Sequence, residues 1–244
     1  MSEDTGVVPG WYGKIPALGD FASRRLPNNF ISQWDTWLQH SIATSRAQLA
    51  GQWLDLYLAS PIWRFALAPG VCGEHAWAGV LMPSVDKVGR YFPLTLAVAF
   101  TSPLTMANIF AAHDWYPAIE SVALSALRLD SSLDDLEAGL ARHLFPLTST
   151  LTPAEMPEAH MPAQCWQAPI TEPVALPLTS ATQAQELMSA AMQSLFTAAS
   201  RGQSWWWSCD PDSGAGTLHC CTGLPQPEYP LLLLHGGSEL TMRP

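Results

Sequence analysis

The chain has 244 residues, of which 48% are hydrophobic and only 13% are charged. The apolar content is ample for a sizeable buried core. A surface with so few charged residues suggests exposed apolar patches, which favours a protein that binds a partner. The net charge is −10. Bases and acids balance in the first hundred residues and the whole acidic excess lies beyond them, which argues against binding to nucleic acid.

The N-terminus has no basic region followed by an apolar run, so we expect no secretion signal. The longest apolar runs are far shorter than the roughly 20 residues of a membrane helix, so no membrane insertion is expected. Five cysteines, an odd number in a chain of this length, do not suggest a disulfide framework. Together these features predict a cytoplasmic protein with reduced thiols.

The first predicted elements are a strand over residues 7–16 and a long helix over residues 28–59. Tryptophan and tyrosine favour the strand, and glycine with aspartate predicts a turn at 17–21. Large apolar side chains, three tryptophans among them, recur through the helix at helical spacing. Asn28 or Asn29 is expected to cap its N-terminus.

Three short apolar runs follow, separated by glycine or proline turns, and they predict an antiparallel meander. They lie at 63–67, 76–82 and 92–100. Helices are then predicted over 104–128 and 131–145. Ser131 or Ser132 would cap the second of these, and acidic residues in its first turn suit the helix dipole.

Residues 146–177 contain seven prolines, which exclude most regular structure. The elements expected in and after this stretch are a short strand at 164–168, a helix at 181–201 stopped by Gly202, a hairpin of strands at 204–209 and 217–222, and an apolar element at 231–234. Two of the tryptophans at 205–207 should share one face of their strand. They predict either a strand buried on both sides or an exposed aromatic anchor for a partner.

This order of elements predicts an α+β fold, an antiparallel sheet packed by helices. We expect a first domain at 1–145, an irregular connection at 146–177, and a C-terminal part at 178–244 that completes the same fold with a helix and a hairpin.

Several sequence blocks stand in the order found in one known family. They are Gly13-Lys14-Ile15-Pro16, Gly19-Asp20-Phe21, Arg25-Leu26-Pro27, and the stretches 34–39, 45–46, 61–65 and 79–95. Two thinner blocks follow at 204–206 and 223–225. On these residues the chain resembles the TagF (ImpM) family of type VI secretion-associated proteins.

The resemblance implies a cytoplasmic factor that restrains assembly or firing of the bacterial type VI secretion machine. It implies control after translation, through binding to another protein, with a forkhead-associated (FHA) scaffold protein as the expected partner. It also implies a longin-like or profilin-like sandwich with C-terminal hairpin and helix additions.

The sequence contains none of the common motifs for nucleotide binding, metalloproteolysis or serine hydrolysis. We therefore expect no catalytic residue and no cofactor. Two alternatives stay open: a hydrolase or ligand-binding enzyme that uses Asp20 and Asp86 with an arginine, or a structural subunit of the secretion apparatus.

The densest polar cluster lies at 83–93, between two predicted strands, and includes Ser84, Asp86 and Arg90. One interpretation is a turn in which Asp86 accepts hydrogen bonds from local amides and Arg90 pairs with a carboxylate. The other is a recognition loop in which Arg90 offers its guanidinium to a partner's carboxylate.

A second polar set balances in sign and lies in tryptophan-rich segments. Its members are Asp20, Arg24, Arg25, Asp35 and Arg64. The preferred hypothesis is an internal ion-pair network, since buried charges must be matched. The alternative is a polar groove in which a partner docks.

Cysteine and histidine gather at 209 and 219–221 and raise the possibility of zinc. Adjacent side chains in a strand face opposite ways, so only His219 and Cys221 would share a face. Two ligands with Cys209 fall short of a tetrahedral site, and we expect no metal.

Overall fold

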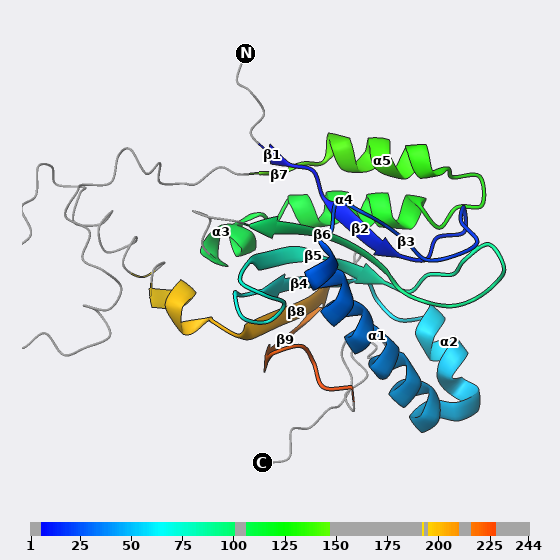
Figure 1. Ribbon diagram of the computed structural model, residues 1–244, viewed down its shortest axis with the longest axis horizontal. Helices are drawn as coiled ribbons and strands as arrows, with labels where there is room; N and C mark the ends of the chain where they lie inside the picture. Colours follow the sequence, from blue (N-terminus) through cyan, green and yellow to red (C-terminus); the bar gives the residue numbers. More distant parts are fainter. Residues whose placement is uncertain (1–5, 101–105, 147–191, 193–194, 210–215, 228–244) are drawn as a thin grey trace, which may run out of the picture.

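The computed structural model describes residues 6–100, 106–146, 192, 195–209 and 216–227 (Figure 1). The elements expected at 164–168 and 231–234 lie outside the described residues, as do nearly all of the proline-rich connection and the first part of the helix expected at 181–201. The described end of that helix stops before Gly202, as predicted, and Gly202 has a positive φ of 77°.

Within the described ranges, the centre of the fold is an antiparallel sheet of seven strands in the order β3-β2-β6-β5-β4-β8-β9. The strands are β2 (Gly10–Gly13), β3 (Ala22–Arg24), β4 (Trp63–Leu67), β5 (Ala76–Met82), β6 (Leu94–Phe100), β8 (Gln203–Cys209) and β9 (Gly216–Thr222). A separate pair joins β1 (Gly6–Val7) to β7 (Phe145–Pro146). The predicted meander is confirmed as β4-β5-β6, and the predicted hairpin as β8-β9.

The strand predicted over residues 7–16 is wrong in its extent, because it divides into β1 and β2 and stops at Gly13. Gly13 has a φ of 137°, and a Cβ there would lie 2.1 Å from the carbonyl oxygen of Pro93. Only glycine tolerates this conformation and this close approach. The chain then turns and returns as β3, a short edge strand that the sequence pattern did not reveal.

The helix predicted over 28–59 is three pieces: α1 (Asn28–Leu49), a 3-10 turn η1 (Ala50–Gln52), and α2 (Trp53–Leu58). The break falls at Ala50, whose φ is 44°. The predicted asparagine cap is wrong, since Pro27 is the N-cap residue and makes no side-chain cap bond. The carbonyl of Pro27 accepts from the amides of Phe30 and Ile31 instead.

The helix predicted over 104–128 is also interrupted, giving α3 (Met106–Ala111) and α4 (Trp115–Ser125). Pro117 explains where α4 can begin, because a proline lacks the amide that a helix interior needs but fits the first turn. The following helix, α5 (Leu133–Arg142), has the predicted Ser132 cap. The amide of Asp135 donates to Ser132 Oγ at 3.1 Å, and the Asp135 carboxylate accepts from the Ser132 amide at 2.9 Å.

Helices cover both faces of the sheet (Figure 1). One apolar cluster joins one face to α1 and α2, and a second joins the other face to α3, α4 and α5. Side chains along β5 alternate between them: Trp77 and Leu81 face α1, whereas Ala78 and Val80 face α4. The predicted α+β class is confirmed.

The tryptophans of β8 follow the same alternation. Trp206 is fully buried and packs on Trp34 and Phe65 beneath α1, whereas Trp205 and Trp207 contact Phe110 of α3 on the other face. The strand buried on both sides is therefore correct, and the exposed aromatic anchor is not found. Among the described residues, even the 22-residue α1 is too polar to qualify as a membrane-crossing helix.

Candidate functional site

The loop from β5 to β6 is built around the buried carboxylate of Asp86. Oδ1 accepts from the backbone amides of Val88 at 3.0 Å and Arg90 at 2.9 Å. Oδ2 accepts from Arg90 Nε at 2.6 Å and lies 3.0 Å from Lys14 Nζ. The loop is therefore folded around one carboxylate that pairs with two cations, Lys14 and Arg90.

Burial acts to raise the pKa of Asp86, since it penalises the charged form. The hydrogen bonds from the Arg90 amide, the Lys14 ammonium, the Arg90 guanidinium and the Val88 amide outweigh that effect and hold the pKa of Asp86 well below its usual range. The carboxylate therefore stays charged and is fully hydrogen-bonded at physiological pH.

Neighbouring contacts fasten the loop to the rest of the fold. Arg90 also donates to the carbonyl of Gly19 at 2.5 Å and lies 3.7 Å from Asp20. Ser84 Oγ donates to the carbonyl of Lys14 at 2.5 Å, and the Ser84 backbone exchanges two hydrogen bonds with the Tyr57 hydroxyl. The contacts of the turn interpretation are present, with Asp86 accepting from local amides and Arg90 paired with carboxylates; the interpretation as a recognition loop stays a prediction.

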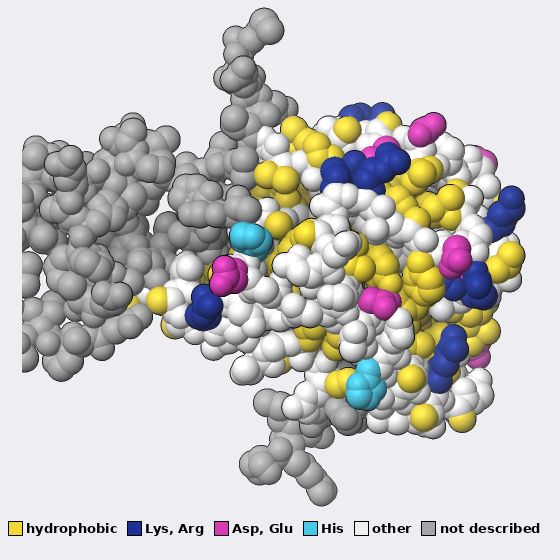
Figure 2. Space-filling model, in the orientation of Figure 1, with side chains coloured by type: hydrophobic (Ala, Val, Ile, Leu, Met, Phe, Trp, Pro, Cys, Tyr) yellow, Lys and Arg dark blue, Asp and Glu magenta, His cyan; other side chains and the backbone are white. Residues whose placement is uncertain are grey.

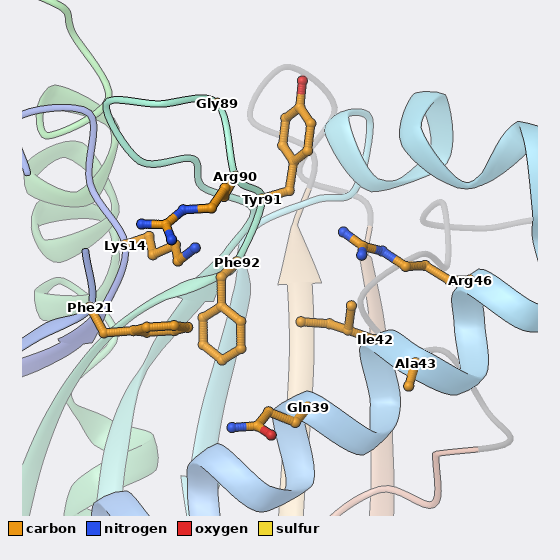
Figure 3. A pocket seen from close by; sticks show the side chains of 10 residues that line it. All are labelled: Lys14, Phe21, Gln39, Ile42, Ala43, Arg46, Gly89, Arg90, Tyr91 and Phe92. Atoms are coloured by element: carbon orange, nitrogen blue, oxygen red, sulfur yellow. The ribbon is translucent and has the colours of Figure 1, made fainter. Parts of the chain in front are cut away.

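A groove of about 490 Å³ lies between this loop and α1, and we call it the α1–loop groove. Its main side chains are Lys14, Phe21, Gln39, Arg46, Arg90 and Phe92. In Figure 3 Arg46 reaches in from α1, and Lys14 and Arg90 lie together on the opposite side, with the Phe92 ring between the two sides. Figure 2 shows Lys and Arg side chains standing among hydrophobic ones on the side of the molecule where α1 and α2 lie.

Arg25 and Arg64, also predicted for the site, do not line this groove and pair with different acids. Arg64 pairs with Glu120 of α4 at 2.6 Å. Arg25 pairs with Glu137 of α5 at 2.5 Å, and Arg24 lies 3.4 Å from the same carboxylate.

Asp35 has no cation as its partner within the described part of the chain. It accepts hydrogen bonds from the Tyr12 hydroxyl and from Gln39 Nε2. The preferred hypothesis of an internal ion-pair network among Asp20, Arg24, Arg25, Asp35 and Arg64 is therefore wrong in its pairing, because none of the five pairs with another. Arg24 and Arg25 share Glu137, Arg64 pairs with Glu120, Asp20 lies near Arg90, and Asp35 accepts from uncharged groups.

Glu120, Glu137, Tyr57 and Arg46 are important residues that the sequence reasoning missed. The two glutamates lie on predicted helices, where an acid normally faces solvent, so nothing local marked them as partners. Arg46 belongs to the block at 45–46 that carries the family resemblance, and this membership was the one sequence feature that could have marked it as a site residue.

The cysteine and histidine cluster does not assemble. His219 and Cys221 do alternate with Cys220 along β9, and the His219 ring packs edge-on against Trp63 with centroids 5.4 Å apart. Within the ranges described, no three side chains of His, Cys, Asp or Glu are placed to hold a metal ion.

Comparison with known proteins identifies a family over the segment that contains the α1–loop groove. The family of TagF N-terminal domains, described as type VI secretion system-associated, matches residues 10–143. The chain belongs to the TagF family. A search of curated proteins finds no match.

A solved structure extends the TagF relationship along the chain. The crystal structure of PA0076 from Pseudomonas aeruginosa PAO1 is similar, with a TM-score of 0.69 and 30% sequence identity over 97% of this chain and 98% of the other. The matched family segment holds the whole α1–loop groove. The β8-β9 hairpin lies beyond that segment, yet β8 pairs directly with β4 and extends the same sheet.

Proposed function

We propose that this TagF-family chain is an accessory regulator of type VI secretion that acts after translation, by binding another protein of the apparatus. The proposed effect is inhibitory and the proposed site of action is the cytoplasm. An FHA scaffold protein of the same system is the expected partner. The single observation that supports the proposal most is the match of residues 10–143 to the type VI secretion-associated domain.

The geometry favours binding over hydrolysis. An enzyme using Asp20 and Asp86 with an arginine needs at least one carboxylate that can reach a substrate. Asp86 is 3% exposed and its two oxygens are engaged by Lys14, Val88 and Arg90. Asp20 is exposed but lies 3.7 Å from that same arginine, so the three groups hold one another in place.

Deleting the gene in the native bacterium tests the proposal. We expect more type VI substrate in the culture supernatant, with unchanged amounts of the apparatus proteins inside the cell, and a return to the original level on complementation. A rise in secretion that follows a rise in apparatus protein would place control at expression. Unchanged secretion would contradict the proposal.

The partner is tested with purified proteins. We expect the chain and the FHA protein to co-elute in gel filtration as a stoichiometric complex, and to give a saturable isotherm in calorimetry. The variant Arg128→Glu is a suitable control, since Arg128 is 70% exposed and its one ion-pair partner among the described residues is its neighbour Asp130. If the chain instead sediments with assembled sheath, a structural subunit would be the better description.

A further inference from the structure

The α1–loop groove gathers positive charge from three separate elements. Lys14 follows β2, Arg46 lies on α1, and Arg90 lies on the loop between β5 and β6. Among the described residues, no aspartate or glutamate lines the groove. The groove therefore presents three cations at its lining, with Asp86 behind Lys14 and Arg90 and the exposed Asp20 3.7 Å from Arg90, although the chain as a whole carries a net charge of −10.

Of the three cations, Arg46 is the one best placed to bind an anionic ligand. Its guanidinium lies over the ring of Trp53, 4.2 Å from the centroid, and no acid pairs with it in the described part of the chain. Stacking holds a guanidinium in one plane and leaves its N–H edges free to donate to an oxyanion. Arg46 is thus oriented before any ligand arrives.

Lys14 contributes a buried charge with spare donors. Its side chain is 6% exposed, it lies over the Phe21 ring at 4.7 Å, and it contacts Asp86 at 3.0 Å. An ammonium has three N–H donors, and a single carboxylate shared with Arg90 does not use them all. Two acids, the buried Asp86 and the exposed Asp20, lie beside Lys14 and Arg90. Arg46 is then the groove cation that no acid offsets in the described part of the chain, and an anion in the groove would pair with it.

Exposed apolar side chains at the edge of the groove favour a ligand that is part of a protein. Phe21 is 43% exposed at the groove, and Val88, next to the lining residue Gly89, is 67% exposed. An acidic side chain could reach the three cations while its backbone and neighbours cover these apolar side chains, as partner segments commonly do.

We infer that the α1–loop groove is the docking site for an acidic side chain of the protein partner, a carboxylate or a phosphoryl group, held by Arg46, Lys14 and Arg90. This inference rests on the proposed function for the identity of the ligand. The oxyanion chemistry of the groove does not depend on it and is tested on the isolated chain.

The first experiment is an NMR titration of the intact ¹⁵N-labelled chain with inorganic phosphate and, separately, with acetate, at constant ionic strength. We expect saturable shifts of the Val88, Arg90 and Tyr91 amides and of Arg46 Nε, with the tighter probe showing whether a phosphoryl group or a carboxylate is preferred. In Arg46→Glu we expect binding weakened by about tenfold or more. Shifts that do not saturate with either probe would overturn the inference.

Lys87→Glu is the matched control. It introduces the same change of charge one residue from Asp86, on an exposed side chain that does not line the groove. We expect it to bind phosphate or acetate within about twofold of the unmodified chain, because screening weakens a charge outside the contact. If Lys87→Glu and Arg46→Glu weaken binding equally, the effect is general electrostatics and the inference is wrong.

The second experiment separates this inference from the proposed function. The gene-deleted bacterium is complemented with the unmodified chain, Arg46→Glu or Lys87→Glu, each checked for equal abundance. We expect the unmodified chain and Lys87→Glu to restore the original secretion level and Arg46→Glu not to. If all three restore it, the proposed function stands and the docking site is wrong; if the unmodified chain has no effect, the proposed function itself fails.

Discussion

Arg64 of β4 holds Glu120 of α4 through two parallel hydrogen bonds, with Nε at 2.6 Å and the second terminal nitrogen at 2.8 Å from the carboxylate oxygens. The two side chains are only 15% and 18% exposed. The bond from the guanidinium to Glu120 raises the pKa of Arg64, and the pair ties the sheet to the helical layer that covers it.

Replacing Arg64 by alanine should destabilise the fold. The change leaves the mostly buried Glu120 carboxylate without its donor, so we expect the free energy of unfolding to fall by about 1–2 kcal/mol, after allowing for solvent screening. Denaturant titration measures this, and a cycle with Glu120→Ala isolates the coupling between the two residues. Arg128→Ala, which breaks the exposed pair with Asp130, is the control and should leave the free energy of unfolding nearly unchanged. Equal effects at the two sites would contradict the assignment.

Glu137 should make the fold sensitive to acid. Burial acts to raise the pKa of this carboxyl, but hydrogen bonds from Arg25 and from the Trp11 indole outweigh it, so the pKa lies below its ordinary value of 4.5. A carboxyl whose pKa is lowered by folding stabilises the native state above its unfolded pKa and loses that contribution as the pH falls through the folded value. We therefore expect Glu137→Gln to lower stability by about 1 kcal/mol at pH 7.

The dependence of unfolding free energy on pH tests the role of Glu137. The difference in unfolding free energy between the unmodified chain and Glu137→Gln should be constant above pH 5 and should shrink steadily below about pH 4.5, because the protonated acid and the amide are then alike in charge. A difference that stays the same down to pH 3 would show that Arg25 does not stabilise the charged form.

The central strands β4 and β5 were the most predictable part of this fold. Trp63–Leu67 and Ala76–Met82 have the bounds that the sequence predicts, because each is a short apolar run closed by turn residues on both sides. The Ser132 cap was equally readable, since the cap and its partner Asp135 are three residues apart. Such features depend on residues close together in the chain, and these are the features that a single sequence can predict.

Pairings between distant segments were not predictable. Arg64 and Glu120 are 56 residues apart, and Arg25 and Glu137 are 112 apart. A single sequence says which residues carry charge but not which layers of the fold meet, so the right residues were assigned to the wrong partners. The Asp86 turn succeeded for the opposite reason: its main partners, Val88 and Arg90, lie within four residues.

Gly79 of β5 should tolerate no side chain. A Cβ at this position would lie 2.3 Å from the carbonyl oxygen of Leu96 and 2.5 Å from the Phe65 ring, so the sheet or the aromatic layer beneath α1 must shift. We expect Gly79→Ala to lower the free energy of unfolding by about 2 kcal/mol, in the range of overpacked cores. Gly51→Ala is the control, since a Cβ there meets nothing within 4 Å, and thermal unfolding compares the two. A neutral Gly79→Ala would mean that both the Phe65 ring and the β6 backbone at Leu96 shift at little cost.

The thiols should differ sharply in reactivity. Cys72 is 1% exposed, and burial raises the pKa of its thiol to about 12, whereas Cys209 and Cys220 are exposed. Since the thiolate is the reactive form, both access and charge protect Cys72. With iodoacetamide at pH 8 we expect Cys209 and Cys220 to be alkylated first and Cys72 at least about a hundredfold more slowly, as followed by peptide mass spectrometry. In denaturant the three rates should converge; comparable rates in the folded chain would show that the cluster beneath α1 opens readily.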